Sequence, residues 1–198
     1  TPVTPVTHQD YTWRWSSLEK TPSISHEVTQ GDLVGFANSK QGLEASKACN
    51  NTQICDRVAL YMSGSDLDST PITDIVFYNG YTFQKFLEYL RTSRGIDKAT
   101  PIYFPRSVTV YNSGNTQAKV DGFIVAEGNI DYQCPCDFTG YNPSFMSING
   151  NITLGNGGAA NIKGAVICLN ENSNIQLNRC GGTITGGVIS HGNIVMNG

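Results

Sequence analysis

Short runs of β-branched residues recur between glycines and asparagines in the last third of the chain. Three segments are alike: 120–126 (VDGFIVA), 162–168 (IKGAVIC) and 184–190 (ITGGVIS). A Gly/Ser-Asn-Ile motif keeps the same spacing, with its asparagines at Asn129, Asn151, Asn174 and Asn193. Self-similarity at about 20 residues with this content is typical of a β-solenoid. The sequence therefore predicts a mainly β fold in which residues 119–198 form stacked coils.

The residues inside each segment suit such a coil. Alternate side chains of a strand point to the same face, so we expect one row of each segment to face the interior. That row is Val120, Ile124 and Ala126; Ile162, Val166 and Cys168; Ile184, Val188 and Ser190. Its last member is small, as a tapering or cornering interior requires. The alternative is a loose Gly/Asn-rich antiparallel sheet whose spacing is accidental.

Glycine and asparagine are expected to have positional roles. Gly122, Gly164 and Gly186 are placed where a coil bends and where a Cβ would obstruct the neighbouring coil. The asparagines of the repeat tolerate turn geometry. Stacked on successive coils, they are expected to share hydrogen bonds, as in the Asn ladders of cross-β structures.

Residues 11–118 predict a smaller α+β region. Its one clear amphipathic helix covers about residues 83–94, because four apolar residues recur there at helical spacing. Those residues are Phe83, Phe86, Leu87 and Leu90. Thr82 is expected to cap its N-terminus, while Arg91 and Arg94 favour its C-terminal end and Gly95 stops it. We expect this helix to lie across the strands or to cap the first coil.

The remaining pattern upstream is weaker. Apolar runs predict strands at 57–62, 75–78, 102–104 and 108–111, and a helical turn is expected at 42–48. Asn79-Gly80 and residues 112–115 are expected to form turns.

Composition and charge narrow the function classes. The chain has 198 residues, of which 39% are hydrophobic and only 15% charged, with a net charge of −3. Without a basic patch, neither nucleic acid nor an anionic membrane surface is an expected partner. No apolar run reaches the length of a membrane span. Residues 1–10 are interpreted as a linker, and the chain as a mature ectodomain from which any anchor is absent.

Six cysteines indicate an oxidising compartment. Cys49 and Cys55 flank a short polar loop and are expected to form a local disulfide. Cys134 and Cys136 are too close in sequence to pair without strain, so we expect them to reach Cys168 and Cys180. The alternative, four thiolates around zinc, fits poorly because structural zinc sites prefer cysteines two to four residues apart. No cofactor and no metal are expected.

Candidate binding residues are aromatic. Tyr11, Trp13 and Trp15 share one face of an extended segment, which would suit the stacking of a sugar ring. The competing interpretation is that they pack against the helix or the end of the solenoid. Asp66 and Asp68 raise the possibility of calcium, but the loop lacks the EF-hand pattern, so a solvated turn is expected. No catalytic motif is present, and the acidic residues of the repeat keep no common position.

The Gly-x-Ile-Val and Gly-Asn-Ile motifs between Val120 and Gly198 resemble the β-solenoid portions of bacterial type IV pilus-associated proteins, such as PilX-like minor pilins and the competence-associated pilin of the filament tip. The resemblance implies a non-enzymatic, cell-surface ectodomain with other pilus subunits as partners. We therefore expect an extracellular adhesin or minor pilin ectodomain. Two alternatives stay open: a carbohydrate-binding or polysaccharide-active β-helix protein, and a structural fibre or filament subunit.

Overall fold

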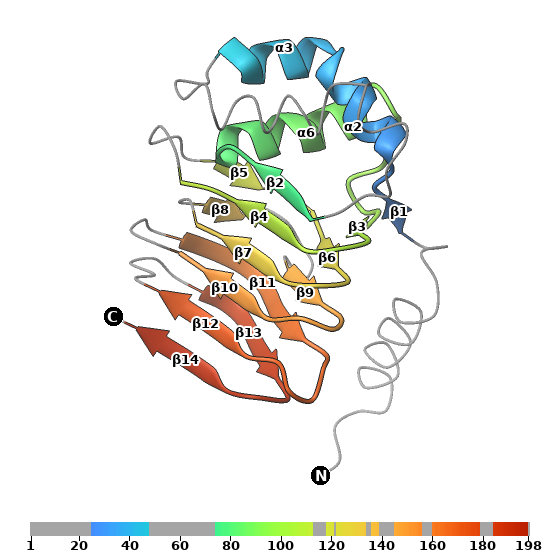
Figure 1. The fold of residues 1–198 in the computed structure, drawn as a ribbon. Helices are drawn as coiled ribbons and strands as arrows, with labels where there is room; N and C mark the ends of the chain where they lie inside the picture. Colours follow the sequence, from blue (N-terminus) through green and yellow to red (C-terminus); the bar gives the residue numbers. More distant parts are fainter. Residues whose placement is uncertain are drawn as a thin grey trace.

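The chain is mainly β, with strands arranged in parallel sheets beneath a group of helices (Figure 1). A computed structural model describes residues 25–47, 74–112, 118–120, 122–133, 136–138, 145–155, 160–178 and 184–197. The predicted strand at 57–62, the Asp66/Asp68 loop and the residue 1–10 linker lie outside these ranges.

One sheet contains six of the described strands, all parallel. In spatial order they are β2 (Ile75–Phe77), β4 (Val108–Val110), β7 (Ile130–Tyr132), β10 (Ile152–Leu154), β12 (Ile175–Asn178) and β14 (Ile194–Asn197). The register aligns the first residue of every strand, so the isoleucines of the Gly-Asn-Ile motif form one row.

A second sheet faces the first. Each of its six main strands comes directly before a strand of the six-stranded sheet along the chain. Its described strands are β1 (His26–Glu27), β3 (Ile102–Phe104), β6 (Ile124–Ala126), β9 (Phe145–Ser147), β11 (Ala160–Cys168) and β13 (Ile184–Ser190), again all parallel. The first part of β11 pairs with β8 (Cys136–Phe138), which pairs with β5 (Ala118–Val120). We call two consecutive strands, one from each main sheet, a rung.

This parallel register is compatible with the predicted coils and contradicts the antiparallel alternative for the strands described. Ile124, Val166 and Val188 occupy one row, as expected, but the row also contains Phe145 between the first two. The rung β9–β10 was missed in part because its first strand lacks the Gly-x-Val-Ile pattern. The stack also extends upstream of Lys119, since β3 and β4 belong to the same two sheets.

Between the sheets lies one apolar core. Ile124, Phe145, Val166 and Ile152 are almost fully buried in it, while Val188 in the last rung is partly buried. The three predicted small residues, Ala126, Cys168 and Ser190, align at the inner corner, and Ser147, which was not predicted, joins them between Ala126 and Cys168. The Ser147 hydroxyl donates from this position to the Gly128 carbonyl at 2.6 Å, and the Ser190 hydroxyl donates to the Ser173 carbonyl at 2.9 Å.

The bend glycines have the backbone geometry expected of them, and the predicted close approach of neighbouring coils is found at Gly186. Gly122, Gly164 and Gly186 all have positive φ, at 116°, 131° and 150°, a region that favours glycine. Gly164 and Gly186 are also register partners. A Cβ on Gly186 would lie 1.5 Å from the Gly164 carbonyl oxygen, so consecutive rungs approach here at backbone distance.

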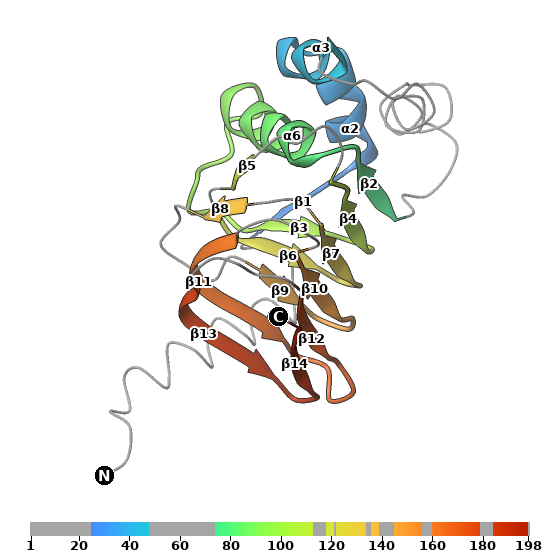
Figure 2. The ribbon, with the colours of Figure 1, turned by 90° about the vertical axis from the view of Figure 1, so that its left-hand side faces the viewer.

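Three described helices cover the β2 end of the stack (Figures 1 and 2). Helix α6 (Gly80–Thr92) begins earlier than expected, because Asn79 and not Thr82 is its N-cap: the Asn79 side chain accepts from the Thr82 amide at 2.8 Å. Thr82 donates its hydroxyl to the same oxygen. Asn79-Gly80, predicted as the turn that closes the preceding strand, is therefore the start of the helix itself.

Helix α6 closes the core at this end, as the sequence predicted. All four residues of its apolar stripe are buried. Phe83 and Phe86 pack against Phe77 of β2 and Phe104 of β3, with ring centroids 5.0 to 6.4 Å apart. These contacts join the helix to both sheets.

Helices α2 (Gln30–Ala37) and α3 (Lys40–Lys47) lie beyond α6. The sequence predicted only the second, as a turn at 42–48. Thr29 and Asp32 form a reciprocal capping box at the start of α2, and Lys85 of α6 pairs with Glu44 of α3 at 2.8 Å. None of the described helices is long and apolar enough to cross a membrane.

Candidate functional site

Polar side chains line the corner at which the chain passes from one main sheet to the other. Each repeat asparagine lies immediately before a strand of the six-stranded sheet. Its side-chain oxygen accepts the backbone amide of the next corner residue: Asn151 binds Asn129 at 2.8 Å, Asn174 binds Asn151 at 2.7 Å, and Asn193 binds Asn174 at 2.9 Å. These contacts form a ladder along the stack.

The ladder extends upstream with different residues. Ser107 takes the asparagine position in the β3–β4 rung, and its hydroxyl accepts the Asn129 amide at 2.8 Å. The Ser107 amide in turn donates to Asp74 at 3.2 Å. The backbone carbonyl of each corner residue also accepts the backbone amide of the first strand residue in the preceding rung. The Asn151 carbonyl, for example, accepts the Ile130 amide at 2.9 Å. The expected sharing of hydrogen bonds is thus found, but the donors are backbone amides and not side-chain amides.

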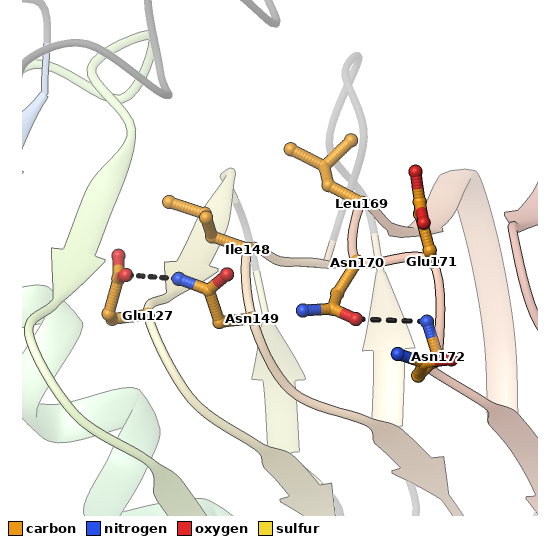
Figure 3. A pocket seen from close by; sticks show the side chains of 7 residues that line it. All are labelled: Glu127, Ile148, Asn149, Leu169, Asn170, Glu171 and Asn172. Atoms are coloured by element: carbon orange, nitrogen blue, oxygen red, sulfur yellow. Dashed lines mark hydrogen bonds between the residues drawn. The ribbon is translucent and has the colours of Figure 1, made fainter.

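A groove of about 480 Å³ lies on the outside of this corner (Figure 3). Its lining comes from the residues that follow β6, β9 and β11: Glu127, Ile148, Asn149, Leu169, Asn170, Glu171 and Asn172. Glu127, Ile148 and Leu169 directly follow aligned strand residues on three rungs, and Asn149 and Asn170 lie one position further along. The repeat itself builds the groove.

Hydrogen bonds hold part of the groove in place. The Glu127 carboxylate accepts from the Tyr103 hydroxyl at 2.7 Å on one oxygen and from the Asn149 side-chain amide on the other. Burial and this carboxylate raise the pKa of Tyr103, so the phenol stays a donor. Asn170 accepts the Asn172 amide at 2.9 Å.

The groove chemistry is that of a hydroxyl-binding surface. Two carboxylates and three primary amides offer acceptors and donors, and Ile148 and Leu169 add apolar area between them. Across the described residues, no group of three or more His, Cys, Asp or Glu side chains comes together to hold a metal ion.

The candidate residues from the sequence are distributed differently. Tyr11, Trp13 and Trp15 lie outside the described ranges, as do Cys49, Cys55, Cys134 and Cys180, so their binding and pairing stay predictions. Cys136 is placed only as backbone, in β8.

Cys168 is a free thiol in the structure, so its expected disulfide is not found. The physical reason is that the Cys168 side chain points into the core. It belongs to the inner corner row and is fully buried, and its Sγ donates to the Asn174 carbonyl at 3.8 Å. Burial raises its pKa to about 11.

We expect Cys168 to resist alkylation in the folded protein and to react after denaturation, because both burial and the raised pKa suppress the thiolate. Peptide mass spectrometry after iodoacetamide treatment, with and without guanidinium, measures this. If Cys168 in the folded protein is alkylated as fast as an exposed thiol, its placement in the core is wrong.

Sequence reasoning missed the groove. The available signal was that Glu127, Asn149 and Asn170 each lie one or two residues after a strand of the repeat, but Glu127 differs from the two asparagines in both residue type and position. No protein-family model matches the chain, and neither curated proteins nor solved structures gave a significant match.

Proposed function

We propose that this chain is a β-solenoid ectodomain that works at the cell surface as a non-enzymatic protein, an adhesin or minor pilin ectodomain of a type IV pilus-like system. The corner ladder is the observation that carries the proposal. Asn129, Asn151 and Asn174 use their side chains to join rung to rung. These polar side chains therefore stabilise the stack itself.

The helical cap supports a display role. Helix α6 closes the core at one end and leaves the asparagines of the corner exposed along the described rungs. Asn129, Asn149, Asn151 and Asn174 are all exposed. A hydrogen-bonded stack with an exposed polar corner is suited to presenting a binding surface, because residues held on a fixed scaffold carry much of recognition.

Protease treatment of intact cells that naturally express the chain tests this location. We expect proteinase K to remove the protein while a cytoplasmic protein in the same cells survives, as judged by immunoblotting. Full protection of the chain until the cells are lysed would contradict the proposal. Co-purification with sheared surface filaments then separates a pilus role from another surface role.

The groove favours a second candidate function, carbohydrate binding. Hydrogen bonds to a charged group contribute about 1.5–3 kcal/mol. If a sugar hydroxyl binds Glu127, the Glu127→Gln variant is therefore expected to lose roughly tenfold or more in affinity. A glycan array identifies the ligand and titration calorimetry measures the change.

Glu88→Gln is the matched control, because Glu88 lies on α6 and contacts Lys85. It is expected to leave glycan affinity unchanged. Binding that survives Glu127→Gln but is lost in Trp13→Ala and Trp15→Ala would assign the ligand to the aromatic segment and reject the groove.

A further inference from the structure

Among the residues that the structure describes, the apolar core is covered by helices at one end and uncovered at the other (Figure 1). In β12, Ile175 and Leu177 face the core and are 0% and 2% exposed. Their register partners in β14, Ile194 and Met196, are 45% and 74% exposed. The same inward positions are therefore covered in one rung and uncovered in the next, at the end opposite α6 (Figure 1).

The two strands of this rung also present free edges. Among the described strands, β14 pairs only with β12 and β13 only with β11. Because backbone groups of a parallel strand alternate between its two neighbours, half of those in β14 face away from β12. Ile189 and Val195 on the outer faces are 38% and 42% exposed.

This edge lacks the devices that normally protect one. Exposed edge strands usually carry lysine, other charges, proline or a bulge that discourages pairing. Residues 184–197 contain no Asp, Glu, Lys, Arg or Pro. A surface that is apolar, uncharged and rich in unpaired backbone groups is suited to pairing.

We propose that this end of the stack binds the same end of a second copy of the chain. A two-fold axis would place each edge strand antiparallel to a strand of the partner and bring the two open cores together. The absence of charge matters, because a copy of the surface then meets no like charge. Helices α2, α3 and α6 cover the other end, so the contact closes as a dimer and does not propagate into a filament.

The expected affinity is modest. Seven residues of β13 extend about 23 Å at about 3.3 Å per residue, and facing sheets lie about 10 Å apart. The end face is therefore on the order of a few hundred Å² per copy, below the roughly 800 Å² of a standard interface. We expect a reversible dimer with a Kd in the micromolar range.

Sedimentation velocity of the whole chain across concentrations from about 1 to 200 µM tests the proposal. We expect a monomer–dimer equilibrium, with non-reducing gels showing that no disulfide links the copies. The Val195→Lys/Met196→Lys double variant should remain monomeric throughout. Because both side chains are already exposed, it should keep the wild-type melting temperature.

Leu43→Lys is the matched control. Leu43 is an exposed apolar residue, 58% accessible, on α3 at the capped end, and its replacement should leave the dimer intact. A wild-type monomer at every concentration, as expected if another partner or further residues cover the end, would overturn the proposal. If Leu43→Lys loses association as much as the Val195→Lys/Met196→Lys double variant does, the association is non-specific aggregation and the proposal is also overturned. A series of oligomers larger than the dimer would overturn it too and would indicate a fibre subunit.

Discussion

Val166→Asp is expected to unfold the stack. Val166 is fully buried in β11, aligned between Phe145 and Val188 of the neighbouring strands. An unpaired charge there costs several kcal/mol, which is a large part of the 5–15 kcal/mol that typically stabilises a domain. Circular dichroism should show loss of the cooperative thermal transition.

Gln176→Asp is the control for that variant. Gln176 lies on β12 of the same rung but is exposed, so the same charge should change stability by no more than about 0.5 kcal/mol. Wild-type-like melting of Val166→Asp would show that the row of inner residues is wrongly placed.

Asp32→Ala is expected to cost about 3 kcal/mol. Asp32 is fully buried, and its Oδ2 lies 2.8 Å from His26 Nε2 and accepts the Thr29 amide at 3.0 Å. Arg94 Nε is 3.2 Å from Oδ1, as an ion pair and not as an aligned hydrogen bond. Removing the carboxylate breaks the capping box of α2 and the link from β1 to the end of α6. Because Arg94 is partly exposed, the expected loss of stability is at the lower end of the range for a buried ion pair.

Urea unfolding measures that loss, with Asp97→Ala as the matched control. Asp97 is an exposed acid whose side chain accepts the Ala99 amide within its own turn, so its replacement should cost about 1 kcal/mol or less. If Asp32→Ala and Asp97→Ala unfold at the same urea concentration, the buried link does not stabilise the cap.

The repeat was predictable because its signals are local and periodic. A glycine with positive φ, a small inner residue and an asparagine before an isoleucine recur together, and each has its own physical reason. Gly186 must accommodate the Gly164 carbonyl, and Asn174 must accept the Asn193 amide. Such requirements repeat once per rung and leave a visible spacing in the sequence.

Other parts of the fold depend on contacts that the local pattern does not contain. Phe145 fills the same row as Ile124 and Val166, but an aromatic residue after proline and serine carries no repeat signature. Helix α2 contains Gly31 and Gly35, which lower its helix propensity. Gly35 is required there because a Cβ would lie 2.0 Å from the Tyr89 hydroxyl.

The candidate site was harder still. Asn149 and Asn170 share a position two residues after their strands, while Glu127 lies one residue after its own, so the three residues keep neither one position nor one residue type. Only the register of β6, β9 and β11 brings them together. For Cys168, the sequence signal pointed to a different role from the one that the structure shows. The even number of cysteines in the chain suggested a disulfide, but the position of Cys168 in its strand directs the side chain into the core.

The parallel stacking of rungs is tested most directly by methyl NMR of the isoleucine row. With isoleucine methyl labelling, we expect cross-peaks between Ile130 and Ile152, between Ile152 and Ile175, and between Ile175 and Ile194, because register partners on adjacent strands lie about 5 Å apart. Cross-peaks that instead join strands in antiparallel order, or the absence of all three pairs in a folded protein, would contradict the stack.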